Sequence, residues 1–152
     1  MSVPVWKRSD NKLQAIVDVN KRCAYAMQMC ENEKVIPKKC RWYLCTEIMK
    51  TCIHLVSSVR QINKLRIDKD IETAEMRMKY HTKAMLELEA LWSEMTIAKE
   101  MYNVPNEKID HWSQLALKAD DSLSAWRNSD RKRVKELKET DSTSKKDDNI
   151  PN

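Results

Sequence analysis

The feature that most limits the fold of this chain is that it contains no glycine at all. Glycine readily adopts positive φ and lets the backbone approach a ligand closely. Phosphate-binding loops, dinucleotide-binding fingerprints and tight β-hairpins usually depend on it. We therefore do not expect a nucleotide-binding α/β fold or a hairpin-rich β fold.

The remaining composition is typical of one helical domain. The chain has 152 residues, of which 34% are charged and 41% hydrophobic, and a chain of this size forms one core. No apolar run reaches the roughly 18 residues that a membrane span needs, and the amino-terminal residues lack the apolar core of a signal peptide. These observations predict a cytoplasmic protein.

Hydrophobic periodicity and helix-boundary residues predict four helices. Ser9 or Asp10 caps the first and Asp68 the third, while Pro37 and Pro105 fit the first turns of the second and fourth. The expected bounds are about 9–33, 37–63, 68–102 and 105–128, after an amino-terminal extension at 1–8. Short connections favour an all-α, up-down-up-down antiparallel four-helix bundle.

Apolar spacing indicates which faces of these helices form the core. On the first helix we expect Leu13, Ile16, Val17, Ala24 and Met27. On the third and fourth, heptad spacing selects Ile71, Ala74, Met78, His81, Met85, Leu88, Trp92 and Met95, then Ile109, Trp112, Ala116, Ala119, Leu123 and Trp126. The third helix, roughly 50 Å long at 1.5 Å per residue, is expected either to overhang its neighbours or to make contacts outside the protomer.

The composition changes after residue 128. Residues 130–152 are polar and hold few apolar side chains to offset the entropy of ordering. We expect a largely disordered tail, with a frayed extension of the fourth helix to about residue 138.

The second helix has two apolar faces. At about 100° per residue, one ordinary core stripe contains Leu44, Ile48, Cys52, Leu55, Val59 and Ile62. A second group lies beside it and contains Trp42, Cys45, Met49, Ile53 and Val56. This wide apolar arc predicts a subunit interface, and the alternative is deep burial within one protomer.

The opposite arc of the second helix is basic, with Lys39, Lys50, Arg60 and Lys64 close together. Residues 1–66 hold 13 Lys and Arg against 5 Asp and Glu, whereas residues 67–128 hold 8 against 12. A concentrated cationic surface suits a phosphate backbone. A solvated helix face has the same pattern, so charge alone leaves both interpretations open.

Catalytic and metal-binding patterns are not found in the sequence. None of His54, His81 and His111 has Glu three residues before it, as the ligand pair of di-metal bundles requires. The five cysteines are Cys23, Cys30, Cys40, Cys45 and Cys52, and they form no Cys-x-x-Cys motif. We interpret them as reduced core thiols and expect a non-enzyme without metal or cofactor.

Three segments together resemble the accessory variability determinant (Avd) family of diversity-generating retroelements. Residues 35–44 are similar to the family's aliphatic-Pro-Lys-x-x-Arg-x-x-Leu start of the second helix, and residues 86–102 to its third helix. Residues 122–126, followed by basic residues, are similar to its small-residue-Trp ending. The resemblance covers about residues 10–133. Ser124 and Ala125 stand where members often have glycine, which affects how closely the helix ends pack.

The resemblance implies a homopentameric barrel of four-helix protomers that binds a reverse transcriptase and template RNA and has no catalysis of its own. Its role would be to support mutagenic copying of a template repeat. The expected contacts to nucleic acid or to the polymerase are Lys38, Lys39, Lys50, Arg60, Lys64 and Arg66, with Arg127, Arg131, Lys132 and Arg133 as secondary candidates. Arg41 is predicted to point into the apolar stripe of the second helix. It therefore either contacts nucleic acid or the polymerase, or pairs with a carboxylate or with the end of another helix.

The alternative function is a bundle that mediates only protein contacts through the apolar arc of the second helix. Such a scaffold forms oligomers without affinity for nucleic acid.

Overall fold

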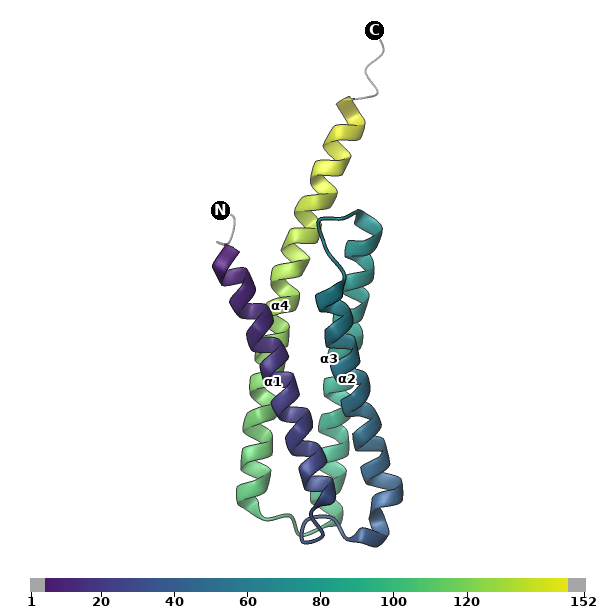
Figure 1. The fold of residues 1–152 in the computed structure, drawn as a ribbon, viewed down its shortest axis with the longest axis vertical. Helices are drawn as coiled ribbons and strands as arrows, with labels where there is room; N and C mark the ends of the chain where they lie inside the picture. The colour runs from purple at the N-terminus through teal and green to yellow at the C-terminus, as the bar shows by residue number, and fades with distance from the viewer. Residues whose placement is uncertain (1–4, 148–152) are drawn as a thin grey trace.

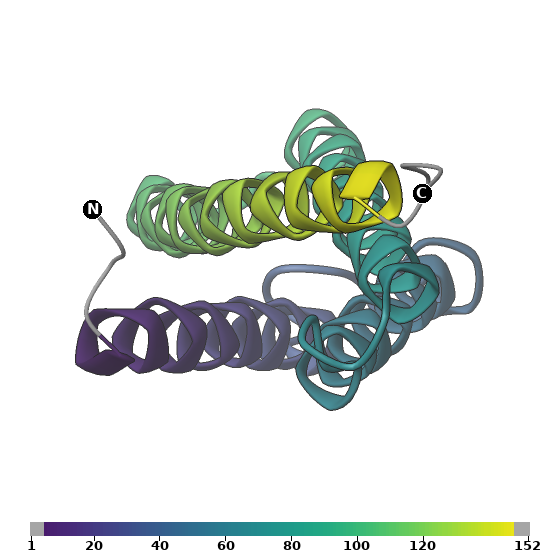
Figure 2. The ribbon, with the colours of Figure 1, turned by 90° about the horizontal axis from the view of Figure 1, so that it is seen from above.

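The computed structural model describes residues 5–147, and side-chain environments for residues 12–146. Within this range the chain forms four α-helices and no strand. The helices are α1 (Val5–Glu31), α2 (Thr46–Lys64), α3 (Ile71–Met101) and α4 (Asn106–Asp147). They run alternately down and up the long axis (Figure 1). Seen from above, α1 and α4 lie beside each other, and α2 and α3 form the neighbouring pair (Figure 2). The predicted four-helix fold is confirmed.

The turns are made without any left-handed residue. No described residue has positive φ, as a chain without glycine requires. Asp70 caps α3 by accepting a hydrogen bond from the Thr73 backbone N–H at 2.6 Å. The predicted cap, Asp68, is wrong because its carboxylate pairs with Arg66 instead.

The predicted second helix is not one regular helix. A 3₁₀ turn (Lys38–Cys40) and a π turn (Arg41–Cys45) precede α2. The assumption of a constant 100° per residue therefore does not hold before Thr46. The predicted basic stripe from Lys39 to Lys64 is wrong at its beginning, because Lys39 does not belong to the same regular helix as the other cations. Within and just before α2 the predicted core stripe is confirmed, since its six residues are all buried.

The core of α3 and α4 follows the predicted heptads only in part. Buried positions on α3 are Ala74, Arg77, His81, Ala84, Leu88, Leu91, Met95 and Ala98. The expected Ile71, Met78, Met85 and Trp92 are partly exposed, because α3 is rotated toward α2. On α4 five of the six expected residues are buried and Ile109 is half-buried.

The predicted core face of α1 is wrong. Leu13 is 58% and Val17 is 43% exposed, and Ala24 is also exposed, with Ile16 and Met27 half-buried. The buried residues are Ala15, Asp18, Val19, Arg22, Cys23, Ala26, Met29 and Cys30. The structure buries small residues and one arginine because α2 and α4 approach α1 on that side.

The helix that overhangs the bundle is α4, not the expected α3 (Figure 1). It has 42 residues against 31 for α3. Its extension packs Val134 and Leu137 against Ile67, Ala74 and Met78 in a small second cluster. Residues 130–147 are therefore helical. The helix passes through the expected frayed extension to about residue 138, and the predicted disorder is wrong for residues 139–147. Residues 148–152 lie outside the described range.

The first helix begins earlier than predicted, at Val5, so residues 5–8 of the expected extension are helical. Residues 1–4 lie outside the described range. None of the helices described here contains a stretch apolar enough and long enough to cross a membrane.

Candidate nucleic-acid interface

The predicted cations separate into two groups at opposite ends of the bundle. Lys38 and Lys39 precede α2, whereas Arg60, Lys64 and Arg66 lie at its other end, where α4 also passes (Figure 1). Lys50 lies between these groups and pairs with Glu47 at 3.0 Å. All six side chains are exposed. Seven of the ten predicted cations belong to the end at which α4 overhangs: Arg60, Lys64, Arg66, Arg127, Arg131, Lys132 and Arg133.

Two hollows flank α4 at this end. The first is lined by Lys12, Arg66 and Arg133 together with residues of the α2–α3 turn. Arg66 donates two hydrogen bonds to the Asp68 carboxylate, at 2.8 and 3.1 Å. These bonds hold the pKa of Asp68 below its usual range, so part of the local positive charge is neutralised.

The second hollow is a groove between α3 and α4 with a volume of about 600 Å³. Its α4 side carries Arg127, Arg131, Lys135 and Lys138, and Met78 and Thr82 of α3 lie opposite. The cations cover 11 residue steps, or about 16 Å along the helix axis. Half-buried Arg127 donates to Thr82 Oγ1 at 3.4 Å. The groove thus has a cationic wall above an apolar floor.

The cations of α4 are concentrated in one stretch of the helix. Residues 127–138 hold six Lys and Arg against two Asp and Glu, whereas residues 106–126 hold two against four. Arg131, Lys132 and Lys135 are exposed and form no ion pair with a described carboxylate. Lys138 pairs with Glu75 of α3 at 2.9 Å. Three adjacent α4 cations are therefore available to an anionic ligand.

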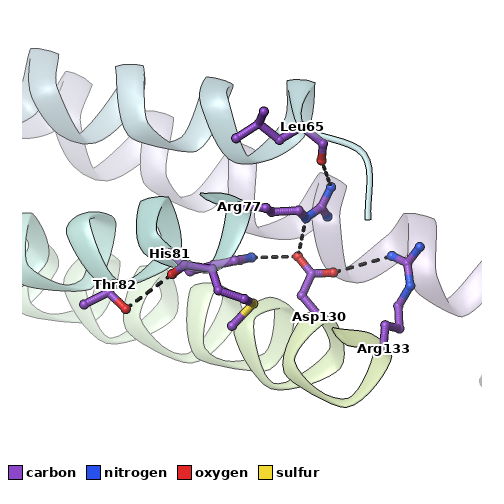
Figure 3. A network of polar contacts seen from close by, with 7 residues as sticks. Leu65, Arg77, His81, Thr82, Asp130 and Arg133 are labelled. Atoms are coloured by element: carbon purple, nitrogen blue, oxygen red, sulfur yellow. Dashed lines mark hydrogen bonds and ion pairs between the residues drawn. The ribbon is translucent and has the colours of Figure 1, made fainter. Parts of the chain in front are cut away.

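A buried polar cluster, called here the Arg77 centre, fixes α4 beside this groove (Figure 3). Asp130 accepts hydrogen bonds from Arg77 Nε and His81 Nε2, both at 2.7 Å. Arg77 also donates to the Leu65 carbonyl at 2.8 Å, and its guanidinium lies 5.5 Å from the Trp126 ring centroid. The cluster therefore joins α3, α4 and the end of α2.

Burial determines the charge states in the Arg77 centre. Burial alone would raise the pKa of Asp130, but hydrogen bonds from His81 and Arg77 hold it below its usual range. Burial lowers the pKa of His81, and this outweighs the opposing effect of Asp130. The imidazole is therefore neutral, with its proton on Nε2 facing the carboxylate. Its Nδ1 is buried and has no hydrogen-bond partner among the described groups, and the hydrogen bond from Nε2 to Asp130 joins α3 to α4.

A second buried cluster, the Arg22 centre, lies between α1, α3 and α4. Arg22 donates to Asp120 and to the Leu88 carbonyl, both at 3.3 Å. Trp92 Nε1 donates to the other oxygen of Asp120 at 2.8 Å, and the Trp92 ring centroid is 5.4 Å from the guanidinium. Burial lowers the pKa of Arg22, against the attraction of Asp120. Sequence reasoning missed this centre entirely.

The predicted subunit-interface residues differ in exposure. Trp42 is 75% and Ile53 is 59% exposed, while Met49 and Val56 are half-buried against the core. Cys45 is 2% exposed and lies inside the protomer, so its assignment to an interface is wrong. Arg41 donates to the Glu31 carbonyl at 2.7 Å, which is the helix-end role considered as one alternative.

The cations missed by sequence reasoning are Lys12, Lys135 and Lys138. Lys135 and Lys138 continue the spacing of Arg127 and Arg131, but that spacing has meaning only if the helix continues beyond residue 128. The signal was present in Val134 and Leu137, which are three residues apart as on one helix face.

Comparison of the chain with known protein families, curated proteins and solved structures gives no match. Within the described residues, no cluster of three or more His, Cys, Asp or Glu side chains is arranged to hold a metal ion. The site is therefore interpreted from its own geometry.

Proposed function

We propose that this protein is a non-catalytic adaptor that binds nucleic acid through the cationic end of the bundle. The observation that supports this function best is the groove wall of Arg127, Arg131, Lys135 and Lys138. Together with Lys132 and the α2 cations, it forms a positive surface much denser than the chain's net charge of +5 suggests.

The chemistry of this surface suits phosphates. Lys and Arg that neutralise phosphates release condensed counterions, and this release drives binding without reading the sequence. Cations one helical turn apart lie about 6 Å from each other along α4, so several of them can contact successive phosphates of one strand. The apolar floor at Met78 leaves room for the ribose or base edge beside the strand.

The resemblance to the Avd family extends this proposal. It would make the ligand a template RNA, the second partner a reverse transcriptase, and the assembly a homopentamer that supports mutagenic cDNA synthesis. This extension is tested by gene neighbourhood. A reverse transcriptase gene with paired template and variable repeats beside this gene supports it, and a locus without them contradicts it.

The exposed side chains of Trp42 and Ile53 favour a second candidate function, a protein-contact scaffold. Large exposed apolar side chains on one helical segment commonly mark an interface. Light scattering coupled to size exclusion distinguishes the two functions when absorbance at 260 and 280 nm is recorded. Oligomers that retain nucleic acid at low salt and release it at high salt support the adaptor, whereas oligomers free of nucleic acid support the scaffold.

The direct test uses two double variants with the same change in charge. Arg131→Glu with Lys135→Glu reverses the groove wall, and Lys38→Glu with Lys39→Glu is the matched control at the opposite end. Binding to a fluorescent single-stranded RNA is measured by anisotropy at several salt concentrations. We expect the groove variant to weaken binding at least about tenfold and to lower the salt slope by about 1.4, or about 0.7 per lost phosphate contact.

Two results would overturn this assignment. Equal loss of RNA binding in both double variants would mean that only the total charge of the protein matters. Unchanged RNA binding by a folded groove variant would exclude the groove as the binding site. Circular dichroism of all variants checks that the helices are intact.

A further inference from the structure

We propose that four of the five cysteines form two cross-helix disulfides, Cys23–Cys52 and Cys30–Cys45, when the protein meets a disulfide oxidant. Sequence analysis assigned these residues to the reduced core, and all are free thiols in this structure. The structure adds how they face each other.

The contacts at the first pair are reciprocal. The Cys23 thiol donates to the Cys52 carbonyl at 3.8 Å, and the Cys52 thiol donates to the Cys23 carbonyl at 3.9 Å. Each sulfur therefore already points at the residue to which it would be joined.

The second pair lies seven residues, or about two turns, farther along each helix. Here the Cys45 thiol donates to the Cys30 carbonyl at 3.8 Å. Cys30 follows Cys23 by seven residues, and Cys45 precedes Cys52 by seven. Both pairs thus belong to one antiparallel register between α1 and the α2 segment.

Helix geometry allows both bonds. Packed helices have axes about 8–10 Å apart, and their Cα atoms lie about 2.3 Å from each axis, so facing Cα atoms approach to about 5 Å. Disulfides span Cα separations of about 4.4–6.8 Å. Small residues such as Ala26, which is fully buried between the pairs, permit this close approach.

The reaction balances with a small-molecule disulfide such as oxidised glutathione. One cysteine thiolate attacks a glutathione sulfur, the S–S bond breaks, and one glutathione thiolate leaves and takes up a proton. The partner cysteine, as thiolate, then attacks the mixed disulfide and releases the second glutathione. Each cysteine pair loses two protons and two electrons as its disulfide forms, and one oxidised glutathione takes them up to become two reduced molecules.

Burial raises the pKa of Cys30, so this thiol is protonated while it stays in the folded core. All four sulfurs are nearly or fully buried, so the oxidant reaches them when α1 moves away from α2 or while the chain folds.

Refolding of reduced, denatured full-length protein in a glutathione redox buffer tests the proposal without depending on access to the folded core. Two disulfides among five cysteines can form in fifteen ways, from five choices of the free cysteine and three pairings of the others. We expect one arrangement, Cys23–Cys52 with Cys30–Cys45, and alkylated Cys40. Reduced ribonuclease in the same tube confirms that the buffer oxidises structural disulfides.

Peptide mapping identifies the pairs. Trypsin separates Cys45 from Cys52 at Lys50, and chymotrypsin separates the two α1 cysteines after Tyr25. A dominant pairing that includes Cys40, or links Cys23 to Cys45, would overturn the proposal. So would a protein that refolds with all thiols reduced while the ribonuclease control is oxidised.

Variants with one cysteine removed provide the matched controls. Cys40→Ser should keep both disulfides, and Cys30→Ser should keep Cys23–Cys52 while leaving Cys45 alkylated. Oxidised wild type should unfold at a higher temperature than reduced wild type, and dithiothreitol should reverse the difference. Two results would contradict disulfides that fit the native packing of α1 against the α2 segment. One is the loss of both disulfides in Cys40→Ser, and the other is oxidised protein that is no more thermostable than reduced protein.

Discussion

The two buried arginines of this bundle are held in different ways. Arg77 reaches Asp130 at 2.7 Å, and that carboxylate is only 2% exposed. Arg22 reaches Asp120 at 3.3 Å, and that carboxylate is 25% exposed. Asp130 also accepts from His81 and Arg133, whereas the second donor to Asp120 is an indole N–H.

The difference shows what a buried arginine requires from its surroundings. In the Arg77 centre both partners of the ion pair are nearly buried, with Arg77 at 8% and Asp130 at 2% exposed, so protein groups must satisfy most of the carboxylate. In the Arg22 centre water reaches the carboxylate, and the cation depends more on the Leu88 carbonyl and the Trp92 ring. The Arg77 centre should therefore be more costly to disrupt, and it also positions the groove wall on α4.

The largest effect is expected from Asp130→Ala, compared with Asp120→Ala. Removing Asp130 leaves Arg77 charged in a dry site and should lower the free energy of unfolding by about 3–5 kcal/mol. Removing Asp120 should cost about 1–3 kcal/mol, because water can replace part of the lost contact. Urea denaturation of both variants measures the difference, and equal losses would refute the comparison.

The next effect concerns the indole donor of the Arg22 centre. Trp92→Phe keeps an aromatic ring near Arg22 but removes the N–H that donates to Asp120 at 2.8 Å. A hydrogen bond to a charged group contributes about 1.5–3 kcal/mol, and we expect a loss in this range. The double variant Trp92→Phe with Asp120→Ala should lose less free energy of unfolding than the sum of the losses in the two single variants. Additive losses in urea would indicate that the indole acts only by packing.

The third effect is a pH dependence confined to the Arg77 centre. The pKa of His81 is lowered on folding, so below the unfolded value of about 6.5 the unfolded chain takes up a proton that the folded chain does not. Stability should therefore fall as the pH drops below about 6.5, by at most about 1.4 kcal/mol per pH unit. Asp130, whose pKa is also lowered, adds a further loss below about pH 4.

The variant His81→Leu isolates this contribution. It should remove the pH dependence between about pH 6.5 and 5 while leaving the effect of other groups, such as Glu94 with its raised pKa, unchanged. Urea denaturation of His81→Leu and of wild type at several pH values measures the difference. A profile that is the same in His81→Leu and wild type would contradict a neutral buried imidazole.

The smallest effect is expected from Arg133→Ala. Arg133 is 32% exposed and contacts Asp130 at 3.5 Å, a distance and exposure at which an ion pair contributes about 0.2–1 kcal/mol. Thermal unfolding should show only a small shift. A loss as large as that of Asp130→Ala would mean that Arg133, and not Arg77, holds the carboxylate.

The candidate site was predictable only where local patterns act. Arg127, Arg131 and Lys132 were identified because basic residues follow Trp126. Lys135 and Lys138 were missed because the extension to about residue 138 was expected to be frayed, whereas Val134 and Leu137 pack against the start of α3. Periodicity also placed Leu13 and Val17 in the core, since it scores apolar side chains and cannot anticipate that Arg22 is buried instead.

The sequence by itself determined the helical class, the number of helices and the approximate positions of the connections between them. The reason is that proline, capping carboxylates and the lack of glycine act on the backbone within a few residues. Only the tertiary structure decided which face of α1 is buried, how far α4 extends and which charges become buried. Those outcomes depend on partners distant in the chain, with Asp120 98 residues from Arg22 and Asp130 53 residues from Arg77, and a buried charge is stable only where such a partner arrives.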